Sequence, residues 1–288
     1  MKKILLSATI ILAIGFTSCK SQKINSTIKK EGKMEISNKE KVIALLKSIE
    51  TGAQEPIGYI NPNKYIQHNL GVSDGLEGFG ALLQQLPPNS AKVNTVRAFE
   101  DGDFVFTQTN YQFFGPKIGF DIFRFEDGKI VEHWDNLQEK PEHPNSSGNT
   151  MIDGTIEIKD INKTEENKTL VKNFVEDILV NGKMEKLAGY FDGDNYIQHN
   201  PNIANGLSGL GKALEYMASK GITMKYNKVH RVLGEGNFVL TVSEGSFADK
   251  NTSFYDLFRV ENGKIAEHWD VMETIAPKGE WKNDNGKF

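Results

Sequence analysis

Apolar residues in this chain recur at two spacings, and the two spacings follow one another in a fixed order. Across residues 165–181, Leu170, Phe174 and Ile178 fall on one face of a helix, which predicts an amphipathic helix there. Residues 39–50 show the same spacing and predict a matching helix earlier in the chain. Each of these two helices begins one half of the protein.

Two more helical segments and a run of strands follow each of these helices. A short helical segment is predicted at 65–69, and a longer helix follows a glycine-rich turn in each half, at 76–85 and 207–220. Alternating apolar and polar residues then predict strands, which in the first half lie at 92–100, 104–113, 119–125 and 129–137. Helices followed by antiparallel strands predict an α+β domain, in which the helices pack on one face of a curved sheet.

The second half repeats the first. The string YIQHN occupies 65–69 and recurs at 196–200, an offset of 131 residues. The string FDIFRFEDGKIVEHWD, which starts at Phe120, matches YDLFRVENGKIAEHWD, which starts at Tyr255, at 11 of 16 positions. A repeat of this length indicates duplicated domains rather than a solenoid. The expected organisation is a first domain at 38–140, a linker at 141–164 and a second domain at 165–288.

The first residues differ from both repeats. Lys2 and Lys3 precede an apolar run at 4–16 that is too short to span a membrane, which predicts a secretory signal peptide at 1–18. Cys19 follows directly and resembles the lipidated cysteine of bacterial lipoproteins. We expect a lipid anchor on Cys19, a tether at 19–37 and an exported protein held at a membrane of the bacterial cell envelope, facing the periplasm. A plain signal peptide with an incidental cysteine is the alternative.

Composition removes some functions from consideration. The net charge is -4 at pH 7, and no basic cluster lies outside the first residues, which argues against a nucleic-acid partner. A single cysteine cannot form an intrachain disulfide, so each domain depends on its hydrophobic core. Hydrophobic residues make up 38% of the chain, as is typical of a globular protein that can build such cores.

Candidate chemistry lies on the last two strands of each half. If Glu126-Asp127-Gly128 forms a three-residue hairpin loop, Asp121 lies opposite His133, and Asp135 shares their face by alternation. A two-residue loop would instead place Asp121 opposite Trp134. In the second half the corresponding residues are Asp256, His268 and Asp270.

The repeated strings resemble one known family. YIQHN, the Glu-Gly-Asp/Asn-Phe-Val turn and the ending Asp-x-Phe-Arg-x-Glu-x-Gly-Lys-Ile-x-Glu-His-Trp-Asp are similar to the SnoaL-like branch of the nuclear transport factor 2-like (NTF2-like) superfamily, in particular to the predicted SnoaL-like aldol-condensation enzymes. The resemblance covers both halves. It implies a cone-shaped α+β barrel in each, with a small-molecule pocket between sheet and helices and no cofactor or metal. The same fold hosts polyketide cyclases, ketosteroid isomerase, dehydratases and binding proteins, so it does not fix the reaction.

The resemblance also implies roles for the repeated residues. It favours the first register, because the acid of the ketosteroid isomerase pattern sits where Asp121 does and faces the pocket. An aldol or cyclisation step needs a base next to the carbonyl and a donor for the enolate oxygen, and a buried carboxyl can serve as either. His68 is expected to reach Asp121 from the helical side. The expected catalytic residues are His68, Asp121, His133, His199, Asp256 and His268. The expected ligand-binding residues are Tyr65, Phe123, Asp135, Tyr196 and Asp270, with Phe125 as a further apolar neighbour.

Several interpretations stay open at this point. The expected function is cofactor-free acid–base chemistry on a small apolar carbonyl compound. A binding pocket without turnover and an envelope scaffold are the alternatives, and an Asp–His pair also fits a satisfied polar cluster in a core. Two histidines with Asp121 or Asp135 have the ligand types of a metal site. If only one pocket works, we expect the second, because Pro201 fits the family pattern where the first half has Leu70.

The opposite face of the sheet carries predictions of its own. Trp134 and Trp269 are expected there, together with ion pairs between Arg124 and Glu132 and between Arg259 and Glu267. This face commonly forms the dimer contact in the superfamily. We therefore expect the two domains to use it on each other, as a covalent pseudo-dimer.

Overall fold

The computed structural model describes residues 36–288. The predicted signal peptide, Cys19 and nearly all of the tether lie outside the described residues. Within 36–288, no helix is both long enough and apolar enough to cross a membrane.

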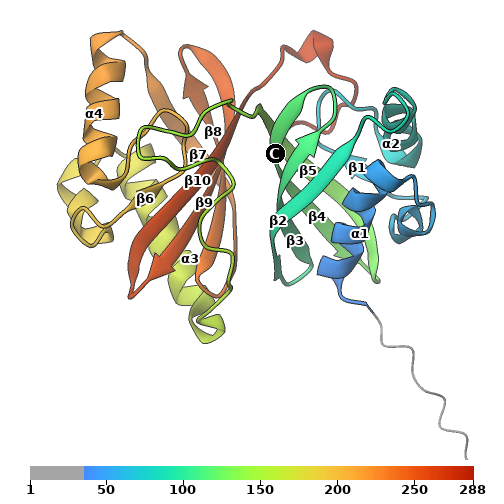
Figure 1. Ribbon diagram of the computed structural model, residues 1–288, viewed down its shortest axis with the longest axis horizontal. Coiled ribbons are helices and arrows are strands. Elements are labelled where there is room, and N and C mark those ends of the chain that lie inside the picture. Colours follow the sequence, from blue (N-terminus) through green and yellow to red (C-terminus); the bar gives the residue numbers. More distant parts are fainter. Residues whose placement is uncertain (1–35) are drawn as a thin grey trace, which may run out of the picture. The chain divides into compact units, whose positions relative to one another are not determined.

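Domain 1 consists of two α-helices, a 3₁₀ helix and a five-stranded sheet (Figure 1). Its elements are α1 (Asn38–Thr51), a 3₁₀ helix (Glu55–Tyr59), β1 (Ile66–Gln67), α2 (Gly75–Gln84), β2 (Lys92–Asp101), β3 (Phe104–Gln112), β4 (Pro116–Glu126) and β5 (Lys129–Glu139). Strands β2 to β5 run antiparallel in chain order, and the short β1 adds in parallel to the free edge of β5. Helix α1 begins after Ser37, whose hydroxyl accepts the N–H of Glu40 while the Glu40 carboxylate accepts the N–H of Ser37.

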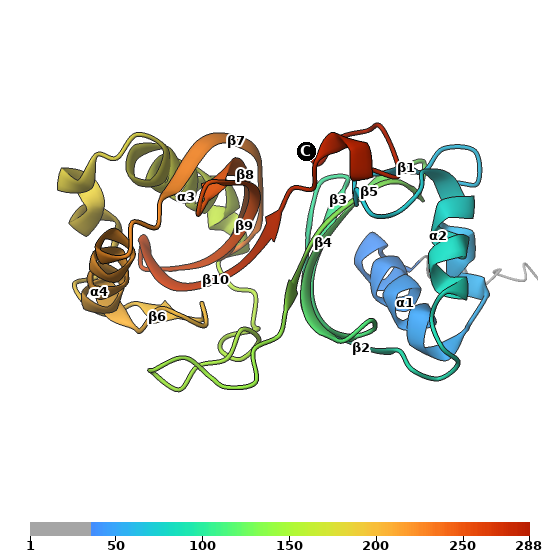
Figure 2. The same cartoon turned by 90° about the horizontal axis from the view of Figure 1, so that it is seen from above.

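Domain 2 repeats this plan. Its elements are a 3₁₀ turn (Ile161–Lys163), α3 (Thr164–Phe174), a π-helical continuation (Val175–Val180), a 3₁₀ helix (Met184–Tyr190), β6 (Ile197–Gln198), α4 (Gly206–Ser219), β7 (Met224–Glu235), β8 (Phe238–Phe247), β9 (Lys250–Glu261), β10 (Lys264–Thr274) and a last 3₁₀ turn (Lys278–Glu280). The sheet order β6-β10-β9-β8-β7 matches β1-β5-β4-β3-β2 of domain 1. Each sheet curves around its own helices (Figure 2), which confirms the predicted α+β fold with helices on one face.

The helical prediction for YIQHN is wrong in both copies. In domain 1, Ile66 and Gln67 form β1 and pair in parallel with Glu132 and His133 of β5, and the N–H of His68 donates to the His133 carbonyl at 2.9 Å. Backbone groups at the open edge of β5 need hydrogen-bond partners, and this segment supplies them. Because successive side chains of an extended segment point to opposite faces, the glutamine and the histidine of the motif diverge.

The β4–β5 hairpin differs from the prediction in both loop and register. Its loop is residues 127–128, whose φ angles of 47° and 72° are both left-handed. A β-bulge at Val131 follows, so that Asp121 lies opposite Asp135. The predicted pairing of Asp121 with His133 is therefore wrong by two residues. An even shift keeps every side chain on its own face, so these three side chains still share the inner face of the sheet.

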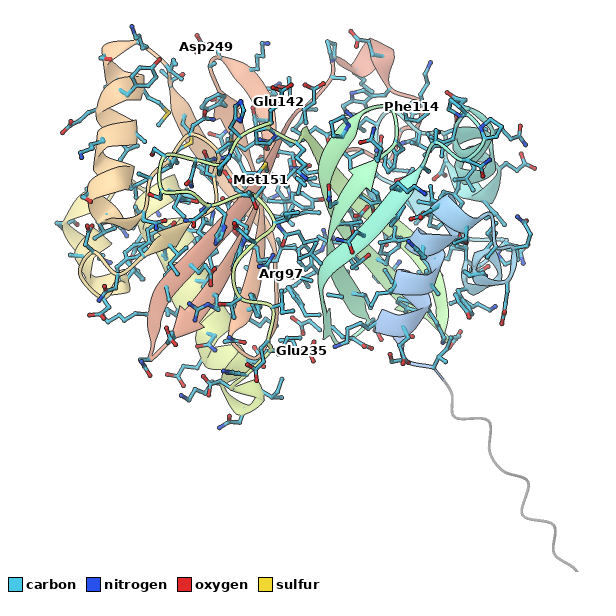
Figure 3. All side chains as sticks on the ribbon, viewed as in Figure 1. Arg97, Phe114, Glu142, Met151, Glu235 and Asp249 are labelled. Atoms are coloured by element: carbon cyan, nitrogen blue, oxygen red, sulfur yellow. The ribbon has the colours of Figure 1, made fainter. Side chains whose placement is uncertain are left out.

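The outer faces of the two sheets share one hydrophobic cluster. It contains Trp134 from domain 1 and Trp269 from domain 2, both buried. Two arginines reach across in a reciprocal way: the guanidinium carbon of Arg97 lies 4.1 Å from the ring centroid of Trp269, and that of Arg231 lies 4.1 Å from the ring centroid of Trp134. Figure 3 shows Arg97 between the two sheets. Each desolvated cation–π contact contributes about 2 kcal/mol to this junction.

The outer face also carries the predicted ion pairs. Nε of Arg124 donates to Oε2 of Glu132 at 2.6 Å, and Nε of Arg259 donates to Oε2 of Glu267 at 2.6 Å. Both predictions are confirmed. These pairs matter for the site below, because each glutamate also binds a histidine of YIQHN.

Candidate functional site

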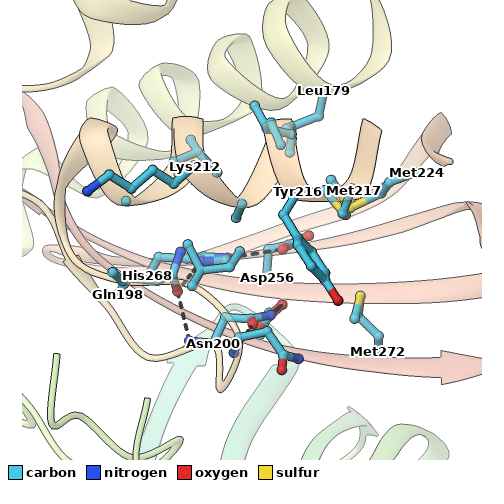
Figure 4. A pocket seen from close by; sticks show the side chains of 18 of the residues that line it. Leu179, Gln198, Asn200, Lys212, Tyr216, Met217, Met224, Asp256, His268 and Met272 are labelled. Atoms are coloured by element: carbon cyan, nitrogen blue, oxygen red, sulfur yellow. Dashed lines mark hydrogen bonds and ion pairs between the residues drawn. The ribbon is translucent and has the colours of Figure 1, made fainter. Parts of the chain in front are cut away.

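A cavity of about 630 Å³ lies in domain 2, between the inner face of its sheet and helix α4 (Figure 4). Apart from Ser146 of the linker, its lining comes from residues 174–272. Met217, Met224 and Met272 join aromatic and aliphatic side chains on its walls. Its polar lining is Ser146, Tyr196, Gln198, Asn200, Asn202, Lys212, Tyr216, Tyr226, Asp256, His268 and Asp270. Apolar walls with a few convergent polar groups are typical of a small-molecule site.

On the sheet side of the cavity, Asp256 and His268 form a direct hydrogen bond, with Oδ1 and Nε2 3.0 Å apart. Both side chains are buried, and the ring of Phe258 stacks on His268 with centroids 4.7 Å apart. Domain 1 repeats the pair with Asp121 and His133, whose atoms lie 3.3 Å apart. The structure thus brings together the four sheet residues of the predicted catalytic group, two in each domain.

The glutamine of YIQHN, and not the histidine, reaches this pair. Oε1 of Gln198 lies 3.0 Å from Nδ1 of His268 and also accepts the backbone N–H of Asn200 at 2.8 Å. Its Nε2 donates to the hydroxyl of Tyr196 at 3.1 Å. Gln67 repeats the contact in domain 1, 3.1 Å from Nδ1 of the equivalent histidine. No catalytic or ligand-binding role was predicted for these glutamines, although their repetition in both halves was a signal for one.

The predicted positions of His68 and His199 are wrong, because both side chains lie on the outer side of the sheet. His199 stacks on Trp269 with ring centroids 4.6 Å apart, and its Nε2 lies 2.9 Å from Oε1 of Glu267. Its Nδ1 lies 2.8 Å from the carbonyl oxygen of Thr150. The equivalent partners of His68 are Trp134, Glu132 and the carbonyl oxygen of Gly286. Extended geometry explains the error, since the glutamine takes the inner face and the next residue takes the other.

Both ring nitrogens of each of these two histidines face hydrogen-bond acceptors. In each case one acceptor is a carboxylate oxygen and the other is a backbone carbonyl oxygen. Nδ1 of His199 also lies 2.7 Å from Oδ1 of Asp153. Glu267 is ionised: its burial acts to raise its pKa, but the hydrogen bonds from His199 and Arg259 outweigh that effect and lower the pKa to about 2. Each of the two buried histidines therefore bridges a glutamate of the sheet and a backbone carbonyl of another segment.

The carbonyl that His199 binds belongs to the linker. Residues 145–150, which follow domain 1, cross the YIQHN segment of domain 2. Nδ2 of Asn145 donates to the carbonyl oxygens of Asn200 and Ile203, at 3.2 and 3.0 Å. The linker therefore completes the motif of domain 2.

The C-terminal segment of domain 2 does the same for domain 1. Residues 283–286 cross the first YIQHN, where Nδ2 of Asn283 donates to the carbonyl oxygens of Asn69 and Val72, at 2.8 and 2.9 Å. The carbonyl oxygen of Gly286 lies 2.8 Å from Nδ1 of His68. We call residues 145–150 and 283–286 the exchanged segments, because the linker closes the motif of domain 2 and the C-terminal segment of domain 2 closes the motif of domain 1.

The asparagine of YIQHN binds a second carboxyl group on the inner face. Nδ2 of Asn200 donates to Oδ2 of Asp270 at 2.7 Å, and Asn69 makes the same contact with Asp135 at 2.7 Å. Among the described residues, Oδ1 of Asp270 has no hydrogen-bond partner. Burial raises the pKa of Asp270, so its carboxyl keeps a proton to higher pH and can donate as well as accept.

A tyrosine hydroxyl reaches the first aspartate of each inner face, and neither tyrosine was predicted as a site residue. Tyr226 of β7 donates to Oδ2 of Asp256 at 3.2 Å, and Tyr111 of β3 donates to Oδ2 of Asp121 at 2.8 Å. Because the tyrosines come from strands that are not equivalent, an alignment of the two halves does not reveal them. In domain 1, burial raises the pKa of Asp121 and the hydrogen bond from His133 offsets part of this rise.

The two tyrosine positions leave different space in the two domains. The ring of Tyr111 lies over Gly119, where an added Cβ would be 2.5 Å from its Cε2. In domain 2 a glycine, Gly245, stands at the position of Tyr111, and Tyr226 stacks instead on Phe254 with centroids 4.2 Å apart. Tyr111 is therefore part of the core of domain 1, whereas the same position in domain 2 has no side chain.

One group among the described residues has side-chain atoms close enough to hold a metal ion. It is Asp121, His133 and Asp135, whose ligand atoms lie within 4.8 Å of one another. The ammonium of Lys287 lies 3.7 Å from Oδ1 of Asp135 and disfavours a second cation there. Tyr111 already donates to Asp121. These contacts fit a hydrogen-bonded acid–base pair better than a metal site.

Comparison with known proteins bears on the fold. Residues 171–268 match a protein family described as the SnoaL-like domain. A candidate ketosteroid isomerase from Kribbella flavida DSM 17836 is similar at 16% identity and a TM-score of 0.34, over 40% of this chain and 84% of that chain. An NTF2-like protein of unknown function from Cytophaga hutchinsonii ATCC 33406 is similar at 16% identity and 0.32, over 37% and 94%. An LEH-like epoxide hydrolase from M. tuberculosis is similar at 22% identity and 0.30, over 38% and 85%.

No curated protein matches the chain. The family match and the two five-stranded sheets with their helices identify the fold as NTF2-like α+β, consistent with two tandem domains. For the second half, the match confirms the SnoaL-like resemblance read from its sequence.

Proposed function

We propose that the cavity of domain 2 binds a small apolar carbonyl compound, and that Asp256 and His268 transfer a proton on it without a cofactor. The observation that supports this function is the Asp256–His268 hydrogen bond on the wall of an apolar cavity. A buried carboxyl group beside an imidazole is suited to taking up and returning a proton. Aldol condensation, cyclisation and isomerisation all begin with such a transfer.

In the proposed reaction the Asp256 carboxylate removes a proton from the carbon next to the carbonyl group. The C–H bond breaks, an O–H bond forms on Asp256, and the electron pair moves to the carbonyl oxygen, which becomes an enolate oxygen. Asp270 donates a hydrogen bond to that oxygen, because burial favours its neutral form and its Oδ1 has no partner among the described residues. The apolar walls exclude water and strengthen both interactions.

The test is hydrogen–deuterium exchange in D₂O at the α-carbon of apolar ketones and 1,3-dicarbonyl compounds, followed by NMR. The chain is expected to accelerate exchange in part of this panel. Asp256→Asn is expected to remove the acceleration, by about 10²-fold or more, while ligand affinity is kept. Asp121→Asn is the matched control in domain 1 and is expected to leave exchange unchanged. Exchange at the original rate in Asp256→Asn would contradict the assignment.

A ligand-binding module without turnover is the second candidate, and the methionines of the cavity favour it. Met217, Met224 and Met272 give the walls flexible, polarisable side chains that adapt to ligands of different shape. Native mass spectrometry of the purified chain tests this candidate. A co-purified compound that stays chemically unchanged, together with no exchange across the whole panel, would identify a binder.

Domain 1 is proposed to act as a structural partner in a covalent pseudo-dimer. The reciprocal contacts of Arg97 and Arg231 across the outer faces support this role, as does the ring of Tyr111 in the core of domain 1. A protease site introduced at Glu157 of the linker tests the association. After cleavage the two fragments are expected to elute together in size-exclusion chromatography, and separate elution would contradict the pseudo-dimer.

The lipid anchor on Cys19 and a place in the bacterial cell envelope are proposed from the sequence. Labelled palmitate is expected to enter the full precursor and to be absent from Cys19→Ala. The variant is also expected to leave the membrane fraction. Retention of both label and membrane association in Cys19→Ala would contradict the anchor.

A further inference from the structure

The amide of Gln198 has only one orientation that satisfies its neighbours. The atom that faces the backbone N–H of Asn200 at 2.8 Å must be the carbonyl oxygen, because an amide nitrogen cannot accept. The other end then donates to the hydroxyl of Tyr196 at 3.1 Å. Side-chain amide orientation is therefore fixed here by the hydrogen bonds within YIQHN itself.

The fixed amide determines which nitrogen of His268 carries a hydrogen. Nδ1 faces the Gln198 oxygen at 3.0 Å, and since that oxygen can only accept, Nδ1 must be protonated. A neutral imidazole can carry its hydrogen on either ring nitrogen, and the hydrogen-bond partners of the two nitrogens decide which one is protonated. Gln198 thus leaves Nε2 as the nitrogen that faces Asp256.

The contact between Nε2 and Asp256 then holds a single proton. The two atoms are 3.0 Å apart, which requires a hydrogen between them, either as a neutral carboxyl with a neutral ring or as a carboxylate with an imidazolium. Other titratable groups around the pair are Asp270 of β10, Tyr196 before β6 and Tyr226 of β7. In the carboxylate form Asp256 is the base, and the adjacent imidazolium balances the charge of an enolate.

We propose that Gln198 is a positioning residue for the acid–base pair: it fixes the His268 tautomer and so directs the shared proton to Asp256. This proposal rests on the proposed function of the same cavity for its catalytic consequence. Gln67 makes the same contacts in domain 1, where its Oε1 accepts the N–H of Asn69 at 2.8 Å and faces Nδ1 of His133 at 3.1 Å. In each half, the glutamine of YIQHN therefore fixes the tautomer of a histidine on the sheet.

The test is long-range ¹H–¹⁵N NMR of the chain with labelled histidine, with His268→Gln and His133→Gln used to assign the signals. His268 is expected to keep hydrogen on Nδ1 at every pH at which the protein is folded, so that only Nε2 loses its proton. Gln198→Met removes the acceptor at similar length and is expected to give a mixed or Nε2–H tautomer, while His133 stays unchanged. Gln67→Met is the matched variant and is expected to show the reverse.

A carboxylate oxygen also accepts, so Gln198→Glu is expected to restore Nδ1–H. In the α-proton exchange assay, Gln198→Met is expected to lower kcat by about tenfold or more with KM unchanged, and Gln198→Glu to recover part of it. A neutral His268 with hydrogen on Nε2 and none on Nδ1 in the unaltered chain would overturn the proposal. An unchanged tautomer in Gln198→Met would also overturn it. If no compound exchanges, the proposed function fails, and the NMR result still decides the role of Gln198.

Discussion

Tyr111 and Tyr226 donate hydrogen bonds to equivalent aspartates from strands that are not equivalent. Tyr111 pairs with Val93 across β2 and β3, whereas Tyr226 pairs with Gly245 across β7 and β8. The tyrosine has therefore changed sides within one cross-strand pair. Two halves that differ at this pair still place a hydroxyl on the aspartate, which indicates that the buried carboxyl group needs that donor.

Tyr226→Phe is expected to lower the free energy of unfolding by about 2 kcal/mol, because it leaves a buried carboxyl group with one donor fewer. It is also expected to slow α-proton exchange in the proposed reaction, since the carboxylate form of Asp256 then loses a hydrogen bond that stabilises it. Urea unfolding and the exchange assay measure the two effects. Tyr111→Phe is the matched variant, with a similar loss of stability and no effect on exchange. An equal loss of exchange in Tyr111→Phe would show that domain 1 takes part in the reaction.

Asp270→Asn is expected to stabilise the protein at neutral pH. Burial raises the pKa of Asp270, so folding favours its protonated form, and its cost grows as pH rises from the ordinary value of 3.8 through the raised pKa. The neutral amide removes that cost, so the free energy of unfolding is expected to rise at pH 8 and to stay unchanged near pH 3. Urea unfolding at both pH values measures the difference. Equal effects at pH 3 and pH 8 would contradict the explanation.

Asp135→Asn, the matched change in domain 1, is expected to act in the opposite direction. Asp135 lies 3.7 Å from the buried ammonium of Lys287, and Asp270 has no such cation in an ion pair among the described residues. Removing one carboxylate leaves Lys287 with Glu273, at 2.6 Å, as its remaining partner. The free energy of unfolding is expected to fall at pH 8, and a rise would mean that Lys287 does not compensate Asp135.

Glu267 gives the protein a second dependence on pH. Its folded pKa of about 2 lies below its ordinary value of 4.5, because hydrogen bonds from His199 and Arg259 outweigh its burial. The stability that it contributes is therefore complete above pH 4.5 and is lost as pH falls from 4.5 to about 2. The loss is expected to be about 3 kcal/mol, measured as a shift in the urea midpoint. In Glu267→Gln the curve is expected to be flatter over this range, and an unchanged slope would contradict the assignment.

The exchanged segments can be weakened one at a time. Asn283→Ala removes two hydrogen bonds to the carbonyl oxygens of Asn69 and Val72, and is expected to cost about 2 kcal/mol. Hydrogen exchange is expected to become faster in the first YIQHN and to stay unchanged in the second. Asn145→Ala is the matched change, with the faster exchange in the second copy. Faster exchange in the second copy for Asn283→Ala, or in the first copy for Asn145→Ala, would contradict the crossed arrangement.

Much of the fold could be predicted because the repeat displays it twice. The apolar spacing located both helices of each domain and the strands, and the two-residue error in the β4–β5 register did not matter, since an even shift preserves faces. The error at residues 65–69 had a larger effect. A helix would place the whole motif on one wall of the pocket, whereas the strand β1 sends Gln67 inward and His68 outward.

Other parts of the candidate site could not be predicted from the sequence pattern. Tyr111 and Tyr226 occupy different positions in the two halves, so comparing the halves cannot pair them. The exchanged segments have asparagines at different spacing, Asn145 and Asn149 in one and Asn283 and Asn285 in the other. Contacts of this kind depend on how two distant segments meet in space, and no local period encodes them.

The crossed segments give the duplication a consequence for how the halves can change. A substitution in the first YIQHN alters the contacts of residues at the end of the second domain, and a substitution in the second alters the contacts of the linker. The sequences of the two halves therefore cannot change independently of one another at these contacts. Each half constrains the other, because a change in either YIQHN motif also changes the contacts of the exchanged segment that closes it.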